Sequence, residues 1–139
     1  MNRPGDKAKN RSLDDWLADM HRDASAIVRN TIDISKDDFL ENEVLQDHVI
    51  RRLTNIGEAS KYVGQFFPEF RDRITVIPWS KLARTRDVLN HAYFGTEPQL
   101  LRQMAIYDIP PIDRDLGIVI RNRRAARGLG QSSDKDQGR

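Results

Sequence analysis

The chain has 139 residues, of which 38% are hydrophobic and 32% are charged, and its formal net charge is +2 at neutral pH. A chain of this length and composition is expected to form one domain with a well-solvated surface. It contains no cysteine, which excludes disulfides, thiolate zinc sites and cysteine nucleophiles. No apolar run approaches the roughly 18 residues that span a bilayer, and no secretory signal is visible. We therefore expect a cytoplasmic protein that does not bind membranes.

The positive charge lies at the two ends of the chain. Residues 1–11 carry a net charge of +3 and residues 121–139 a net charge of +4, which leaves −5 for the middle. A protein that binds nucleic acid through its overall field needs a basic body. Basic, polar ends are instead typical of solvated disorder. We expect flexible tails over residues 1–11 and 127–139, which could add weak, salt-sensitive attraction to RNA, and a domain over residues 12–126.

The first predicted helices have clear start signals. Ser12 followed by Asp15 resembles a capping box, and apolar residues after it recur at a spacing of three to four. Ser35 and Asp38 repeat the same pattern. The second helix is expected to run without interruption from Ser35 to about Gly64.

Proline and glycine divide the rest of the chain. Residues 68–77 are expected to connect two helices, with one helical turn at most. A third helix is predicted from Pro78 to Phe94, and Gly95 would end it. A fourth is expected from Thr96, and Pro110-Pro111 would break the chain and open a fifth. Short connections between about five amphipathic helices favour an all-α, up-and-down antiparallel bundle with flexible basic termini.

Residues 86–93 form the most informative stretch of the sequence, Arg-Asp-Val-Leu-Asn-His-Ala-Tyr. On a helix, Arg86, Asn90 and Tyr93 share one face, and Asp87 and His91 share a neighbouring face. Arginine can grip phosphate oxygens with two N–H groups, and histidine can carry a proton at neutral pH. Together these two side chains could cleave RNA without a metal or another cofactor.

Supporting roles follow from the same spacing. Asp87 lies one turn before His91 and could orient its ring, while Asn90 offers an uncharged hydrogen bond. Glu58 lies between Gly57 and Ala59, which allow close helix packing, and it could pair with a cation on the third helix. The alternative is that this arginine and histidine only form a solvated helix face, which such pairs more often do. We interpret the two other histidines, at positions 21 and 48, as surface residues without partners.

The 86–93 stretch resembles the HEPN superfamily motif, Arg-x4–6-His with a polar residue after the arginine. Its fuller form, Arg-x4-His-x-Tyr, resembles the HepT toxin branch. Ile77-Pro78-Trp79 followed by residues 82–95 is similar to the family pattern "IPW…I.GMRN.L.H.YFG". Residues 53–59 resemble its "L..IGEA" helix, residues 47–53 the segment just upstream, and Asp108-Ile109-Pro110-Pro111 its "DLP". The likeness covers roughly residues 12–124.

The resemblance implies a helical bundle that forms a homodimer, with two Arg86/His91 pairs in a shared cleft. It implies the toxin of a type VII-like toxin–antitoxin pair, a metal-independent endoribonuclease. Its partner would be a minimal nucleotidyltransferase antitoxin that transfers AMP from ATP to Tyr93. Where the family has Gly-Met before the arginine, this chain has Arg84-Thr85, and Arg84 could add a phosphate contact. The alternative function is a non-catalytic helical module that docks a nucleotidyltransferase and binds nucleotide or phosphate.

Overall fold

The computed structural model describes residues 8–91 and 97–137, with the side chains of residues 90–91 and 129–137 outside the description. All of its regular structure is helical, and no strand occurs in these two ranges. The helices, in chain order, are α2 (Leu13–Thr31), α3 (Lys36–Glu41), α4 (Glu43–Phe66), α5 (Pro68–Arg73), α6 (Trp79–His91), α7 (Pro98–Gln103), a π-helix (Met104–Asp108) and α8 (Ile109–Gln137).

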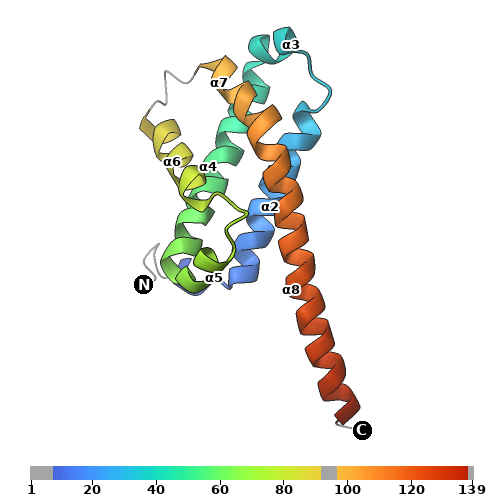
Figure 1. The fold of residues 1–139 in the computed structure, drawn as a ribbon. Coiled ribbons are helices and arrows are strands. Elements are labelled where there is room, and N and C mark those ends of the chain that lie inside the picture. Colours follow the sequence, from blue (N-terminus) through green and yellow to red (C-terminus); the bar gives the residue numbers. More distant parts are fainter. Residues whose placement is uncertain (1–7, 92–96, 138–139) are drawn as a thin grey trace.

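The four long helices alternate in direction. In Figure 1, α2 rises from the N-terminal end, α4 returns, α6 rises again and α8 descends to the C-terminus. Helix α4 packs against both α2 and α6, and α8 packs against α2. The predicted all-α, up-and-down antiparallel bundle is confirmed.

Helix α2 begins where its sequence signal predicts. The Ser12 hydroxyl accepts a hydrogen bond from the Asp15 amide at 3.0 Å, and the Ser12 amide donates to the Asp15 carboxylate at 3.2 Å. This reciprocal capping box satisfies two backbone amides at the helix start. The apolar face of α2 is buried, and Leu17, Met20 and Ile27 are fully inaccessible.

The prediction of one uninterrupted helix from Ser35 to Gly64 is wrong. Ser35 does cap a helix, since its hydroxyl accepts from the Asp38 amide at 3.1 Å, but α3 ends at Glu41. Asn42 leaves the helical conformation, with φ −106° and ψ 89°, and its side chain accepts from the Leu45 amide to start α4. Asparagine favours this local capping bond over a place inside a helix, so the chain bends there.

A helix does open at Pro110-Pro111 as predicted, but the predicted break in the chain before it is wrong. The chain runs as helix from α7 through the π-helix into α8, and both prolines fall in the first turn of α8. At the start of a helix the missing proline N–H costs nothing. The Ile109 amide bonds back to the Met104 carbonyl oxygen, one residue further than in an α-helix. The predicted start at Thr96 and the predicted helix end at Phe94 and Gly95 lie outside the described residues.

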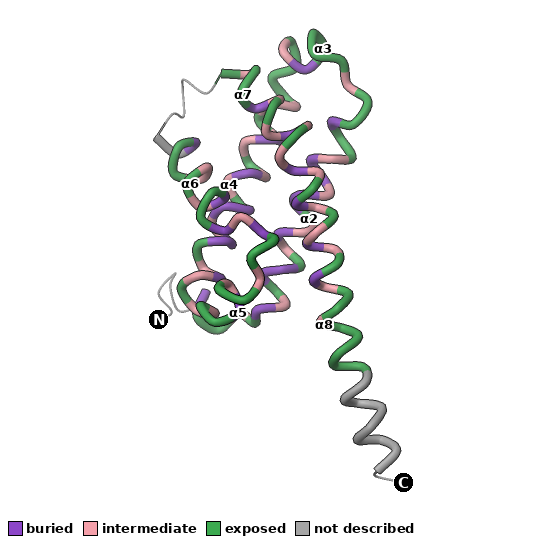
Figure 2. Tube along the Cα trace, in the orientation of Figure 1, coloured by how far each residue is buried: buried purple, intermediate pink, exposed green. Residues whose placement is uncertain are grey.

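The flexible tails expected over residues 1–11 and 127–139 stay a prediction, because the structure describes only parts of them. Ala8 is buried, and Arg11 forms an ion pair with Asp19 of α2, so residues 8–11 pack onto the bundle. Helix α8 continues to Gln137, past the expected end near residue 126. Figure 2 shows α8 changing from mixed burial to full exposure as it leaves the bundle. No proline interrupts residues 118–137, so the backbone can stay helical.

A buried ion pair joins α2 to α4. Asp23 is 3% exposed, and its carboxylate accepts a hydrogen bond from Arg52 Nη1 at 2.6 Å. Isolated charges are rarely buried, so this pair fixes how the two helices face each other.

Candidate active site

Helix α6 is held against α4 by its apolar face. Trp79, Leu82 and Leu89 are each at most 5% exposed, and the Trp79 indole N–H donates to the Ile74 carbonyl oxygen at 2.8 Å. Arg86 follows Trp79 by seven residues, two helical turns, and so lies on this same inward face. The packing of α6 therefore turns the stem of Arg86 toward α4.

Gly57 of α4 makes this close approach possible. A Cβ atom built on Gly57 would lie 2.3 Å from the Cβ atom of Arg86 and 2.6 Å from the carbonyl oxygen of Leu82. Only a residue without a side chain fits between the two backbones. The expectation that Gly57 serves close helix packing is confirmed, and the backbone of Arg86 is fixed by it.

The Arg86 guanidinium is partly buried. Its side chain is 28% exposed, and Nη1 donates to the Asp87 carboxylate at 3.0 Å. Its Nε atom is buried and has no hydrogen-bond partner among the described residues. A buried guanidinium N–H without a partner is costly. A phosphate oxygen could reach only the exposed part of this side chain, where charged N–H groups bind such oxygens well.

The Asp87 carboxylate accepts a hydrogen bond from Arg86, and its side chain is 58% exposed. Because the His91 side chain lies outside the described residues, the role of Asp87 in orienting that ring stays a prediction. The backbones of Asn90 and His91 form the last turn of α6, while their side chains lie outside the described residues, as does Tyr93 altogether. The structure thus places Arg86 and Asp87 together, and the roles of the other three stay predictions.

Glu58 does not join this cluster as predicted. It is half-buried and lines a hollow of about 580 Å³ between α2 and α4, together with Arg11, Trp16 and Tyr62. No ion pair links it to α6 in the described part of the chain. The reason is geometric: Gly57 occupies the face of α4 that meets α6, so its neighbour Glu58 is turned about 100° away.

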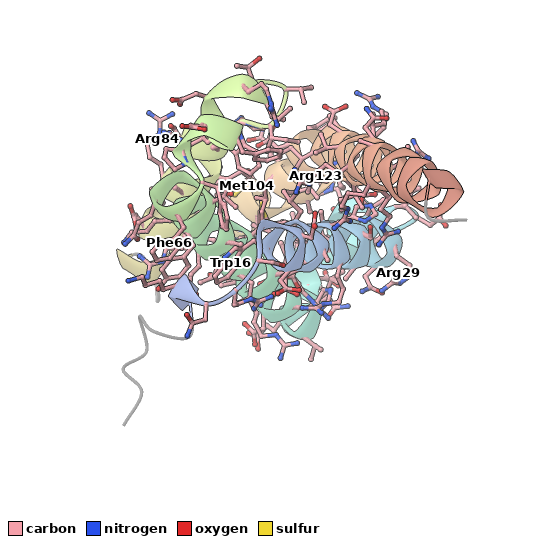
Figure 3. All side chains as sticks on the ribbon, turned by 90° about the horizontal axis from the view of Figure 1, so that it is seen from below. Trp16, Arg29, Phe66, Arg84, Met104 and Arg123 are labelled. Carbon is pink, nitrogen blue, oxygen red and sulfur yellow. The ribbon has the colours of Figure 1, made fainter. Side chains whose placement is uncertain are left out.

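The hollow beside Glu58 is bordered by stacked aromatic rings. Trp16 and Tyr62 stack with ring centroids 5.1 Å apart, Tyr62 stacks on Phe66 at 5.8 Å, and Arg11 lies over Trp16 at 4.3 Å. Figure 3 labels Trp16 and Phe66 on neighbouring helices at this end of the bundle. Because the ring faces are already covered, this stack is a packing feature that holds α2 to α4.

Sequence reasoning missed the partners of two histidines. His21 Nε2 lies 3.3 Å from the carboxylate of Asp113, which also accepts from the Ser25 hydroxyl at 2.5 Å. His48 Nε2 lies 3.0 Å from the amide nitrogen of Asn30. Both histidines lie at the surface as interpreted, since the His21 side chain is 38% exposed and the contact of His48 is exposed, but the expectation that they have no partners is wrong. These contacts join residues far apart in the chain, and no local spacing signals them.

The cluster of Ser25, Asp113 and His21 is not a nucleophile site. Asp113 lies between the other two, so the imidazole contacts the carboxylate, and the Ser25 hydroxyl donates to that carboxylate instead of to a histidine base. An activated serine needs its base as the immediate neighbour.

Within residues 8–91 and 97–137, no three His, Asp or Glu side chains gather as a metal site, and no described helix is long and apolar enough to cross a membrane.

Comparison with known proteins places the chain. The family described as "Ribonuclease HepT-like" matches residues 20–117, a span that includes all of α6 and its Arg-x4-His sequence. The chain belongs to the HepT-like ribonuclease family. The predicted HepT resemblance and the prediction of a ribonuclease are thereby confirmed, and RNA is the substrate class of the family.

The chain matches individual relatives along nearly the whole length of those proteins. "Probable ribonuclease HepT" of Thermococcus cleftensis is 39% identical over 102 residues, 73% of this chain and 90% of that protein. "Putative RNase MJ1380" of Methanocaldococcus jannaschii is 33% identical over 109 residues, 78% of this chain and 97% of that protein. No solved structure matches the chain. The family match ends at residue 117, so the outer part of α8 lies beyond it.

Proposed function

We propose that this protein is the toxin of a type VII-like toxin–antitoxin pair and cleaves cytoplasmic RNA without a metal or cofactor. The observation that carries the proposal is the position of Arg86. Its backbone is fixed against Gly57, its Nε atom is buried without a partner among the described residues, and His91 follows it on α6 in a chain of the HepT-like family. A fixed, partly desolvated guanidinium stabilises developing phosphate charge better than a mobile one.

The proposed reaction is an internal displacement at phosphorus. His91 takes the proton of a ribose 2′-hydroxyl, whose oxygen attacks the adjacent phosphorus. Arg86 neutralises the equatorial oxygens of the phosphorane. The bond between phosphorus and the 5′-oxygen breaks, and the leaving oxygen takes the proton that His91 carries. The products are a 2′,3′-cyclic phosphate and a 5′-hydroxyl, and no oxidant or metal is required.

We propose a homodimer as the active form. Arg86 and His91 are five residues apart, about 140° around an ideal helix, so one helix presents them poorly to a single phosphate. Two α6 helices facing each other would supply an arginine and a histidine to the same phosphate. Asn90 of the same turn would then hydrogen-bond the substrate, and Asp87 would hold Arg86 until RNA arrives.

We also propose that a nucleotidyltransferase antitoxin silences the enzyme by transferring AMP to Tyr93. Tyr93 follows His91 by two residues. Each AMP would add bulk and negative charge beside Arg86, at the place meant for an RNA phosphate. The support is the position of this tyrosine in the HepT-type motif, directly after the described end of α6.

The experiment that tests the activity compares wild type with His91→Ala and Arg86→Gln on single-stranded RNA in EDTA. Wild type is expected to release 2′,3′-cyclic phosphate ends, and both variants are expected to be inactive while unfolding at the wild-type temperature. Cleavage by His91→Ala at the wild-type rate would overturn the assignment. Intact mass before the assay excludes silencing by AMP already on Tyr93.

The ion pair between Arg86 and Asp87 favours a second candidate function. A carboxylate already neutralises the arginine at 3.0 Å. The body of the chain is acidic, so its electrostatic field repels the phosphates of RNA. A non-catalytic module that docks a nucleotidyltransferase and binds nucleotide or phosphate would tolerate both features. Expression alone separates the two: a toxin arrests growth unless its antitoxin is present, whereas a docking module is harmless.

A further inference from the structure

A second basic site lies where α8 leaves the bundle. A hollow of about 340 Å³ between α5 and α8 has an apolar floor and a rim of arginines. The floor includes Phe70 and Val119, and the rim carries Arg73, Arg123 and Arg127. Figure 3, which looks along the bundle from below, labels Arg123 between α2 and α8.

Two of these arginines share one aromatic ring. The Arg123 Cζ atom lies 5.3 Å from the centroid of Phe70, and the Arg73 Cζ atom lies 5.9 Å from it. The two guanidiniums come from different helices, α8 and α5, so two positive charges lie near one ring. The Phe70 ring, which meets the edge of Trp79 at 6.0 Å, stabilises them in part through its π-face.

The acidic groups at this hollow do not balance its cations. Asp14 accepts from Arg123 at 2.9 Å and from Arg127 at 2.5 Å, so one carboxylate serves two arginines. Arg73 has no ion pair or hydrogen bond in the described part of the chain. Neither Glu69 nor Asp72 of α5 lines the hollow. The rim therefore keeps an excess of positive charge around an apolar floor.

We propose that this hollow binds the backbone of single-stranded RNA a few nucleotides from the scissile bond. Arg73 and Arg127 would hold phosphates with their planar guanidinium forks. Unpaired bases can stack on arginine planes and pack on an apolar floor. An acidic peptide would match the charge as well, but the combination of phosphate forks and a base-sized apolar floor favours RNA. This proposal rests on the proposed RNA-cleaving function.

The hollow is connected to the candidate active site by direct packing. Arg123 lies over Phe70, Phe70 packs against Trp79, and Trp79 begins the helix that carries Arg86. Arg86 is two helical turns further along α6, about 10.5 Å along its axis. Because Phe70 and Trp79 are themselves buried, the proposal requires the RNA strand to run over the surface from the hollow to Arg86.

Part of this site lies beyond the residues that the family model matches. Asn122, Arg123 and Arg127 line it, and all three lie after residue 117, where the match to the HepT-like family ends. The outer part of α8 also carries Arg121 and Arg124, and both are exposed. Residues 118–127 contain no acidic residue. The outer part of α8 thus adds cations to a bundle whose middle is acidic. These cations offset the repulsion between that acidic middle and RNA.

The test measures binding of fluorescein-labelled single-stranded RNA of about 20 nucleotides to full-length protein in EDTA. The His91→Ala background prevents cleavage during the measurement. The double variant Arg73→Gln/Arg127→Gln removes two exposed rim cations and keeps Arg123 in place. The matched control Arg29→Gln/Lys36→Gln removes two exposed cations at the other end of the bundle.

The rim variant is expected to bind at least tenfold more weakly than its parent. The slope of log Kd against log salt is expected to fall by about 0.7 for each RNA phosphate that the variant no longer neutralises. The control is expected to stay within twofold of the parent. Equal affinity and slope in the rim variant and the control would overturn the proposal. So would weaker binding of a polyglutamate peptide by the rim variant without any change for RNA.

Cleavage assays separate this proposal from the proposed function. When the rim substitutions are made in the enzyme with His91 intact, they are expected to raise KM for the long RNA. The rate at which this variant cleaves a dinucleotide is expected to stay unchanged. If wild type cleaves RNA and the rim variant has the wild-type KM for the long RNA, only the RNA-backbone site fails. If the rim variant binds RNA weakly but His91→Ala cleaves like wild type, the backbone site stands and the assignment of His91 fails.

Discussion

Gly57 and Arg86 lie at the closest approach of α4 and α6, where a Cβ atom on Gly57 would be 2.3 Å from the Cβ atom of Arg86. The contact involves the backbone side of Arg86 and leaves its guanidinium partly exposed. The candidate active site therefore depends on a glycine in a helix that bears none of the predicted catalytic groups.

Gly57→Ala is expected to destabilise the protein by about 1–3 kcal/mol and to reduce RNA cleavage, because the added methyl must push α6 and Arg86 away from α4. Urea unfolding and the cleavage rate of the folded fraction measure the two effects. Gly64→Ala is the matched control in the same helix, since its methyl would meet only the flexible Arg71 side chain, at 3.0 Å. If both variants behave alike, the close approach is not what positions Arg86.

Arg86→Lys is expected to lower kcat/KM for RNA by about ten- to hundredfold, which corresponds to the loss of a charge-assisted hydrogen bond of about 1.5–3 kcal/mol. Lysine keeps the charge but lacks the planar fork that holds two phosphate oxygens. Steady-state cleavage of a labelled oligonucleotide gives the ratio. Arg84→Lys changes an exposed neighbour in the same way, and a drop of the same size there would argue against a special role for Arg86.

Arg52→Ala is expected to destabilise the fold by about 3–5 kcal/mol, because it leaves the buried carboxylate of Asp23 without its partner. Chemical denaturation of the variant measures this change. Replacing both partners, Asp23→Leu with Arg52→Met, is expected to restore most of the stability, since two apolar side chains need no counter-charge. If the double variant is as unstable as Arg52→Ala, the ion pair contributes more free energy to folding than it takes to bury the two charges.

The ion pairs of Asp14 predict a specific dependence of stability on pH. The hydrogen bond from Arg123 lowers the pKa of the Asp14 carboxyl below its ordinary value of 3.8, and burial opposes this only in part. The folded-state pKa is thus below the unfolded one. The stabilisation is fully present above the unfolded pKa and is lost as the pH falls through the folded pKa.

Asp14→Asn lacks this stabilisation at every pH. Its free energy of unfolding is therefore expected to lie below that of wild type at about pH 7 and to approach it at about pH 3. Denaturation at several pH values, with exposed Asp33→Asn as the control, measures the difference. A gap that stays constant down to the lowest pH would contradict the proposed linkage.

Local chemistry explains what could be predicted. The starts of α2 and α3 follow from Ser12 and Ser35, whose hydroxyls cap amides three residues ahead, and such bonds need no tertiary partner. The antiparallel bundle follows from the spacing of apolar residues and short connections. The Arg-x4-His sequence and its place on a helix also depend only on neighbours in the chain, and the family match supports that assignment.

Tertiary packing decided the rest. The sequence could not show that Glu58 would be turned away from Arg86, because this depends on which face of α4 meets α6. Arg73 is far in the chain from Arg123 and Arg127, and the three became one site only when α8 packed beside α5. By itself the sequence determined where α2 and α3 begin, the apolar face of α2 and the reactive motif. The folded bundle decided which side chains lie beside that motif, because contacts between distant segments form only when their apolar faces are buried together.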